Sequence, residues 1–190
     1  MVLTEEMQAR PAAGETLPTM DETRALGRLH GAETEDLDGS FEPVRLRLLA
    51  ALALEAVGVA QKALELGVEY VSAREQFGKK IGTYQAISHP LATTLMELEL
   101  GRSLALFAAW CIGENDDRTP IAAASAKSLC ADAAVAACER SIQVHGGIGF
   151  TWEHVLHRLY KRALWIQSWE ASGAQLRSEI AAHLLDGDGG

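Results

Sequence analysis

Residues 44–73 of the chain read VRLRLLAALALEAVGVAQKALELGVEYVSA. Apolar side chains recur in this stretch every three or four residues, which places them on one wide face of a helix. The pattern predicts a helix of roughly thirty residues, capped at its start by Asp38 or Ser40, against a usual length of about 11–12. Helices this long are typical of helical bundles, so the stretch determines the fold class that we expect.

More helical segments follow the first one. The second is expected to hold Pro90 in its first turns or at a kink, and the third is unusually rich in alanine, which favours close helix packing. Four long helices with short links predict an all-α fold, an antiparallel four-helix bundle with a short extended N-terminal segment. The helices expected after the first are residues 84–112, 121–144, a short piece at 153–160, and 161–185.

The N-terminal residues differ from this pattern. Residues 1–37 contain prolines, glycine and scattered charges without a sustained helical face, and Thr23–His30 can alternate apolar and polar side chains as a strand would. A strand or two cannot bury enough surface to stand alone. We therefore expect residues 1–37 to be a remnant of a β-domain or a linker, and residues 38–190 to form the bundle domain.

Composition excludes some classes of function. A net charge of -9 argues against a nucleic-acid surface, which needs a basic footprint. The most apolar run, Leu46–Ala60, is interrupted by Arg47 and Glu55, so no membrane span is expected there. The cysteines are three in number without CxxC spacing, which favours neither a disulfide framework nor a zinc site and indicates a reduced, cytoplasmic setting. They are Cys111, Cys130 and Cys138.

Residues 143–170, QVHGGIGFTWEHVLHRLYKRALWIQSWE, combine two features of a functional site. The stretch opens with a glycine-rich turn, and glycines let backbone approach a bulky ligand closely. It closes with Glu170 beside Trp165 and Trp169, and a carboxylate among aromatic side chains is a candidate general base. Together the two features predict a cofactor site with a base. The turn holds Gln143, His145, Gly146, Gly147 and Gly149.

The segment REQFGKKIGTYQ at residues 74–85 resembles the acyl-CoA dehydrogenase family, whose carboxy-terminal helical domain carries Arg-x-x-Phe-Gly followed by a glutamine. The second part of that family's pattern is Gln-x-x-Gly-Gly-x-Gly and, one helix later, a catalytic glutamate. Gln143 and Glu170 match this second part without a gap. The resemblance covers about residues 41–185, the whole helical domain.

This resemblance implies a flavoprotein oxidoreductase with FAD as cofactor and the α,β-desaturation of an acyl-CoA thioester as reaction. Glu170 would be the base, and Arg74 would bind the pyrophosphate of an FAD held mainly by a neighbouring subunit. The site would therefore form across a contact in a homo- or hetero-oligomer, a dimer or a tetramer, with acyl-CoA as substrate. The other residues expected at the FAD are Gln76, Phe77, Gln85, Gln143, Gly146, Gly147 and Ser172.

The sequence departs from the family in three ways. Many members carry Tyr-Glu-Gly-Thr around the base, whereas here the match is Trp-Glu-Ala-Ser at residues 169–172. Some relatives carry the base on the first helix, but the matching position is Leu48, which leaves Glu170 as the candidate. The family also has an amino-terminal helical domain and a middle β-barrel, of which residues 1–37 can hold at most the last strand or two. We therefore expect no turnover from this chain by itself.

Several of these residues also have simpler structural interpretations. His145 is interpreted as a packing or backbone-bonded histidine, and Arg74 as a possible cation for the carbonyls at a helix end. Arg45 and Arg47 belong either to a solvated helix face or to a contact with CoA phosphate. The whole chain could also be a non-catalytic structural or oligomerisation subunit. No metal is expected, because no Glu-x-x-His pair of a di-metal bundle occurs, although His154 with His157 and Glu179 with His183 have ligand spacing.

Overall fold

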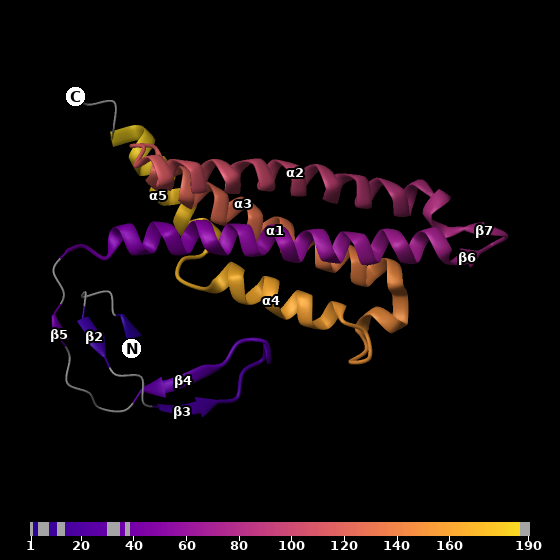
Figure 1. Cartoon of the computed structure of the whole chain (residues 1–190). Coiled ribbons are helices and arrows are strands. Elements are labelled where there is room, and N and C mark those ends of the chain that lie inside the picture. Colours follow the sequence, from indigo (N-terminus) through magenta and orange to yellow (C-terminus); the bar gives the residue numbers. More distant parts are fainter. Residues whose placement is uncertain (1, 4–7, 11–13, 30–34, 37–38, 187–190) are drawn as a thin grey trace.

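Helix α1 (Glu42–Ala73) confirms the long helix predicted from the sequence and extends along most of the molecule (Figure 1). The structure, a computed structural model, describes residues 2–3, 8–10, 14–29, 35–36 and 39–186, so Asp38 lies outside the described residues. The cap predicted at Ser40 is wrong by one residue, because Phe41 is the N-cap and makes no side-chain capping hydrogen bond; Ser40 Oγ accepts a hydrogen bond from the Glu42 amide at 3.3 Å. The other helices are α2 (Gln85–Glu114), α3 (Thr119–His145), α4 (Leu156–Ser168) and α5 (Gly173–Asp186), with 3-10 turns η1 (Ile81–Thr83) and η2 (Gly146–Phe150).

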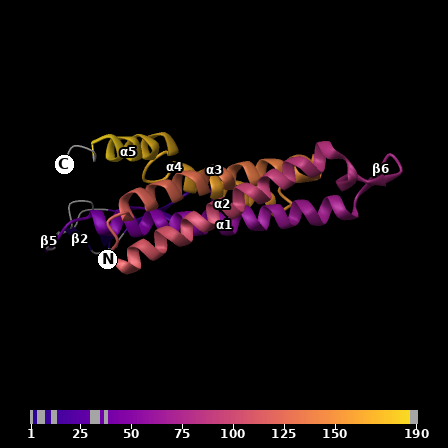
Figure 2. The same cartoon turned by 90° about the horizontal axis from the view of Figure 1, so that it is seen from above.

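Helix α3 lies at the centre of the bundle and packs against α1, α2, α4 and α5 (Figures 1 and 2). Its alanines are mostly buried, which lets four neighbours approach one helix closely. The three cysteines are free and buried in this core, as their apolar surroundings predicted. Burial raises the pKa of the Cys130 and Cys138 thiols to about 12, so both are core side chains rather than reactive thiols.

The fourth long helix predicted over residues 161–185 is wrong in one respect, because it is divided into α4 and α5. Trp169 leaves the helix in an extended conformation, and Glu170 has a φ of 68°. Ser172 and Gln175 then form a capping box: the Ser172 amide and hydroxyl donate to the Gln175 side chain, and the Gln175 amide donates to Ser172 Oγ. Helix α4 therefore takes the bundle's fourth position against α1 and α3, and α5 follows residues 169–172 and packs against α3.

The link between α1 and α2 is a small β-hairpin that the sequence did not predict. Strands β6 (Glu75–Gln76) and β7 (Lys79–Lys80) pair antiparallel, and the two residues between them both have positive φ. Those residues are Phe77, at 53°, and Gly78, at 80°, as a two-residue hairpin turn requires. The hairpin projects beyond the end of the bundle (Figure 1).

Short antiparallel strands precede α1. Strand β4 (Leu26–Leu29) lies within the predicted extended segment and pairs with β3 (Gly14–Leu17), whereas His30 lies outside the described residues. The other strands are β1 (Val2–Leu3), β2 (Gln8–Arg10) and β5 (Glu35–Asp36), which form a separate sheet.

Ion pairs tie the β3–β4 segment to the bundle. Arg162 of α4 contacts Asp21 at 3.2 Å and Glu55 of α1 at 3.1 Å, and Arg24 also pairs with Glu55. The Arg24 guanidinium lies 3.8 Å from the centre of the Trp165 ring. The segment is thus docked where α1 and α4 meet, close to the end of α4.

In the part of the chain that the structure describes, one helical segment, Thr119–Phe150, has the length and hydropathy of a membrane-spanning helix. Of its most apolar window, 67% is packed inside the bundle, and a core helix that is mostly buried passes the same test. The hydropathy of α3 therefore follows from its central position.

Candidate active site

Glu170 occupies a strained three-residue turn. The Ala171 amide donates to the Trp169 carbonyl oxygen at 2.9 Å, across Glu170, whose φ is 68°. This combination is a γ-turn of the rare positive-φ kind. A non-glycine residue held in such a conformation costs about 1–3 kcal/mol and persists only where the surroundings enforce it, which is typical of functional sites.

Arg45 of α1 holds the carboxylate that this turn presents. Arg45 Nε donates to Glu170 Oε1 at 2.6 Å, and its Nη2 contacts both oxygens of Glu179 at 3.0 and 2.8 Å. Burial alone would lower the pKa of Arg45, but the hydrogen bonds to the two glutamates raise it overall. The Glu170 side chain is 17% exposed in this arrangement. Within the described part of the chain, the second oxygen, Oε2, has no hydrogen-bond partner.

The two arginines of α1, Arg45 and Arg47, have different surroundings, which bears on the two roles considered for them, a solvated helix face and a contact with CoA phosphate. Arg45 is engaged with glutamates rather than free for a phosphate. Arg47 is exposed and, among the described residues, donates only to the Pro43 carbonyl of its own helix at 3.0 Å, as a residue of a solvated face does.

The glycine-rich turn lies at the other end of α4 and rests on buried histidine. His145 stacks on Tyr70 with ring centres 4.3 Å apart, and its Nδ1 lies 2.7 Å from the Ser141 carbonyl oxygen. This confirms the packing and backbone-bonded histidine inferred from the sequence. Gly149 is buried: a Cβ there would lie 2.6 Å from the Ile142 carbonyl oxygen. Gly149 is thus required for packing.

The other glycines of the turn face open space. Added Cβ atoms at Gly146 and Gly147 would meet nothing within 4 Å, although Gly146 has a φ of 62° that disfavours other residues. Gln143 is also exposed. Backbone at these positions is accessible to a ligand.

The predicted residues of the hairpin are accessible as well. Arg74, Gln76 and Gln85 are exposed, and Phe77 at the tip is 92% exposed. Gln76 donates to the Glu75 carbonyl oxygen, whereas among the described residues the Arg74 guanidinium has no partner. Ser172, by contrast, uses its hydroxyl in the capping box of α5.

The structure brings the predicted residues together in two groups rather than one. The hairpin and the glycine turn lie toward one end of the bundle, and the Glu170 turn lies toward the other (Figures 1 and 2). Helix α4, with 13 residues, separates the glycine turn from Glu170 by about 20 Å. None of the cavities described below is lined by residues of both groups.

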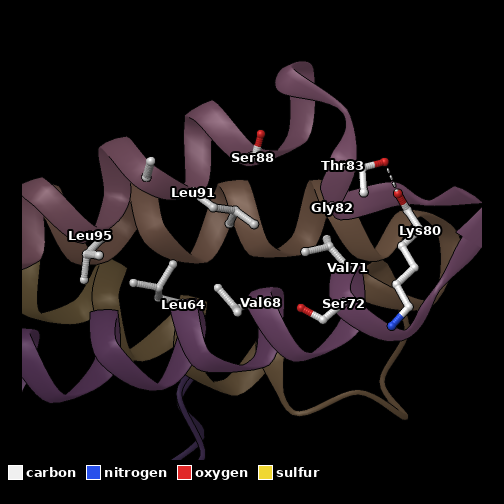
Figure 3. A pocket seen from close by; sticks show the side chains of 11 residues that line it. Leu64, Val68, Val71, Ser72, Lys80, Gly82, Thr83, Ser88, Leu91 and Leu95 are labelled. Carbon is white, nitrogen blue, oxygen red and sulfur yellow. Dashed lines mark hydrogen bonds between the residues drawn. The ribbon is translucent and has the colours of Figure 1, made fainter.

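Several cavities occur beside these groups. A cavity of about 510 Å³ between α1 and α2 has apolar walls, with Lys80 and Thr83 at its edge (Figure 3). A second cavity of about 510 Å³ lies between the β3–β4 segment and α4, and includes Trp165. A third, of about 130 Å³, is lined by Arg45, Glu179 and their neighbours.

No group of three metal-ligating side chains occurs among the described residues. Of the two spacings noted in the sequence, Glu179 pairs with Arg45, and His154 contacts His145 at 4.5 Å between ring centres. These side chains have partners other than a metal.

Sequence reasoning missed Lys127 of α3, whose side chain is completely buried and reaches the Glu170 turn. Its Nζ donates to the Gln167 carbonyl oxygen at 3.1 Å and to the Ala171 carbonyl oxygen. The signal was a lone cation on the apolar face of an alanine-rich helix. The Ser172–Gln175 capping box was also readable as Ser-x-x-Gln.

A bundle with a strained carboxylate turn at one end of α4 and an open glycine turn at the other defines a class of helical domain, and comparison with known proteins identifies it. The family model for the C-terminal domain of acyl-CoA dehydrogenases matches residues 47–185. The chain therefore belongs to the acyl-CoA dehydrogenase family, flavoprotein oxidoreductases, and corresponds to their C-terminal domain.

Curated relatives agree with this assignment. The chain is 38% identical over 153 residues to acyl-CoA dehydrogenase IpdE2 of Mycobacterium tuberculosis, covering 80% of this chain and 45% of the relative. It is 34% identical over 161 residues to (2S)-methylsuccinyl-CoA dehydrogenase of Cereibacter sphaeroides, covering 85% of this chain and 28% of the relative. The chain thus spans less than half the length of these relatives.

Solved structures share the fold. Butyryl-CoA dehydrogenase from Megasphaera elsdenii superposes with a TM-score of 0.78 and 25% identity, covering 94% of this chain and 49% of that one. A G363A variant of the steroid acyl-CoA dehydrogenase Tcur3481–Tcur3483 gives a TM-score of 0.83 and 26% identity, with coverage of 96% and 50%. The predicted antiparallel four-helix bundle is confirmed, with the predicted helix 161–185 divided into α4 and α5.

The glycine turn yields a stability prediction with a matched control. Gly149→Ala forces a Cβ against the Ile142 carbonyl and should lower the free energy of unfolding by about 1–3 kcal/mol. Gly147→Ala enters open space and should change it by less than about 0.5 kcal/mol. Urea unfolding of both variants measures the difference; equal stabilities would show that the turn is not packed as described.

His154 yields a pH prediction. Its Nδ1 accepts the Leu156 amide at 3.3 Å, and burial, with a smaller effect of His145, lowers its pKa from 6.5. The unfolded chain then binds the proton more readily, so stability is full above pH 6.5 and is lost as the pH falls through the lowered pKa. His154→Asn keeps an acceptor for that amide without a titrating group. Its loss of stability between about pH 8 and 5 should be smaller than that of the unsubstituted chain; equal losses would contradict the assignment.

Proposed function

We propose that this chain is the C-terminal domain, or a partial subunit, of an FAD-dependent acyl-CoA dehydrogenase that desaturates an acyl-CoA thioester between Cα and Cβ, with Glu170 as general base. One observation carries the proposal: the strained γ-turn presents a glutamate at the position where the family carries its base. An ordinary surface glutamate on a helix needs no positive φ.

The arrangement around Glu170 suits proton abstraction. Arg45 binds Oε1 and fixes the direction of the carboxylate, while Oε2 has no partner among the described residues and can accept a proton. In the proposed reaction the Cα–H bond breaks and its proton goes to Oε2. The β-hydrogen leaves with its electron pair as the carbon–carbon double bond forms. FAD, when bound, supplies the acceptor for that hydride.

The residues at the opposite end fit part of an FAD site. Arg74 has no partner among the described residues, and its guanidinium suits a pyrophosphate. Phe77 is 92% exposed, and Gly146 and Gly147 leave open space above their backbone. Gln76, Gln85 and Gln143 are exposed beside them. Such projecting groups would contact an FAD held mainly by another subunit; a contact from Ser172 remains part of the proposal.

The same geometry supports assembly. Helix α2 exposes a set of large apolar side chains, and exposed apolar patches of this kind mark contact surfaces. We propose a homo- or hetero-oligomer in the cytoplasm, with residues 1–37 as the remnant of a middle β-domain or a linker and residues 38–190 as the C-terminal domain. The exposed side chains are Leu95, Met96, Leu100, Leu106, Phe107 and Trp110.

A second function is a non-catalytic structural subunit of a heteromeric acyl-CoA dehydrogenase. The exposed face of α2 favours it as much as it favours the enzyme, because association needs no base. The two functions differ in what Glu170 does. A structural subunit requires the bundle and its surface but tolerates any residue that fits the turn.

The test uses the protein in its full assembled form, purified through this chain and loaded with FAD, with bleaching of the flavin by acyl-CoA as readout. Glu170→Gln keeps the size of the side chain and should slow bleaching by about 10²–10⁴-fold without loss of FAD. Glu69→Gln, on the exposed face of α1, is the control and should bleach normally. Unchanged bleaching in Glu170→Gln would exclude it as the base, and an assembly without flavin would favour the structural subunit.

A further inference from the structure

Lys127 occupies a buried position where an amine group destabilises the fold. It lies on the central helix α3, is 0% exposed, and is the largest fully buried side chain among the described residues. Placing an amine in an apolar core costs free energy that a methionine would not. Burial accordingly lowers the pKa of Lys127 from 10.5, while the nearby charges of Glu170 and Asp132 act in the opposite direction.

The amine binds the backbone on both sides of Glu170. Its two acceptors are the carbonyl oxygens of Gln167, in the last turn of α4, and Ala171, the residue after Glu170. The last carbonyls of a helix have no partner within the helix. One ammonium group has three N–H donors, so it can bond the Gln167 carbonyl at the helix end and the Ala171 carbonyl in the turn at the same time. Glu170 lies between these two carbonyls.

Other residues of α3 hold the flanks of the turn. The Gln167 side chain donates to Asp132 Oδ1 at 2.8 Å, which fixes the end of α4. Ser128 Oγ donates to the Gly173 carbonyl oxygen at 3.4 Å, which fixes the start of α5. Of these contacts, those of Lys127 bracket Glu170 most closely.

We propose that Lys127 is a positioning residue that holds the Glu170 turn in its strained conformation and thereby directs the carboxylate toward the substrate; this rests on the proposed function. Lys127 acts through the backbone and does not touch the reacting atoms. Arg45 then sets the direction of the carboxylate from the other side, at Oε1. Without the amine, the two carbonyls lose their donor, and the turn can relax by extending α4 or by opening.

The experiment compares Lys127→Met with Glu170→Gln in the assembled, flavin-loaded protein. Lys127→Met should lower the limiting rate of flavin bleaching by about 10²-fold, because small misplacements of a catalytic group have effects of that size. FAD content and the acyl-CoA concentration for half-maximal rate should not change. In the double variant the loss should not exceed that of Glu170→Gln alone, because Lys127 acts through Glu170.

Two further variants separate positioning from stability. Cys138→Ala removes a buried side chain from α3 at a distance from the turn, and should reduce thermal stability without reducing the bleaching rate. Lys127→Gln keeps a shorter hydrogen-bond donor for the turn and should give an intermediate bleaching rate. It also provides the test if Lys127→Met does not fold. Failure of both Lys127 variants to fold while Cys138→Ala folds would assign Lys127 to global stability and overturn the proposal.

The remaining outcomes distinguish this inference from the proposed function. Normal bleaching in the Lys127 variants, together with slow bleaching in Glu170→Gln, would overturn the inference alone. Multiplying losses in the double variant would likewise contradict action through Glu170. Normal bleaching in Glu170→Gln would remove the base assignment, and the positioning role with it.

Discussion

Glu170 adopts its positive φ because three elements act on one turn. Helix α3 supplies the buried amine of Lys127 to the carbonyls on either side, and α1 supplies Arg45 to the carboxylate. The capping box at Ser172 starts α5 immediately afterwards, so the turn has no freedom to lengthen. The division of the fourth helix follows from this constraint, as does the direction in which the carboxylate points.

The bundle separates two tasks by the length of α4. At one end the glycine turn, based on His145 and Gly149, presents accessible backbone beside the projecting hairpin. At the other end the Glu170 turn presents a carboxylate as its functional group. Neither end encloses a ligand within the described residues, and the chain spans less than half of its curated relatives. Under the proposed function, a working site therefore depends on surfaces contributed from elsewhere in the assembly.

Much of the fold was predictable because helical periodicity can be recognised within a short stretch of sequence. The apolar stripe of α1, the alanine bias of α3 and the buried cysteines all led to correct predictions. The break at residues 169–172 was missed because the apolar positions Trp165 and Ile166 continue into Trp169 without a glycine or proline. The Ser-x-x-Gln pattern at residues 172–175 indicates a new helix start, but the run of apolar positions before it favours one continuous helix. The hairpin at Phe77 was missed because a positive φ at phenylalanine is rare.

The partners that Arg45 and Lys127 find outside their own helices could not be predicted, because these contacts join residues 40 or more positions apart. Such contacts depend on packing rather than on spacing. The most direct test is a crystal structure of the flavin-loaded assembly with an acyl-CoA analogue bound. We predict that Glu170 is in the positive-φ turn, that Lys127 binds both carbonyls, and that a carboxylate oxygen lies about 3–3.5 Å from the analogue's α-carbon. A helix continuous through residue 170, with the carboxylate directed away from the thioester, would contradict it.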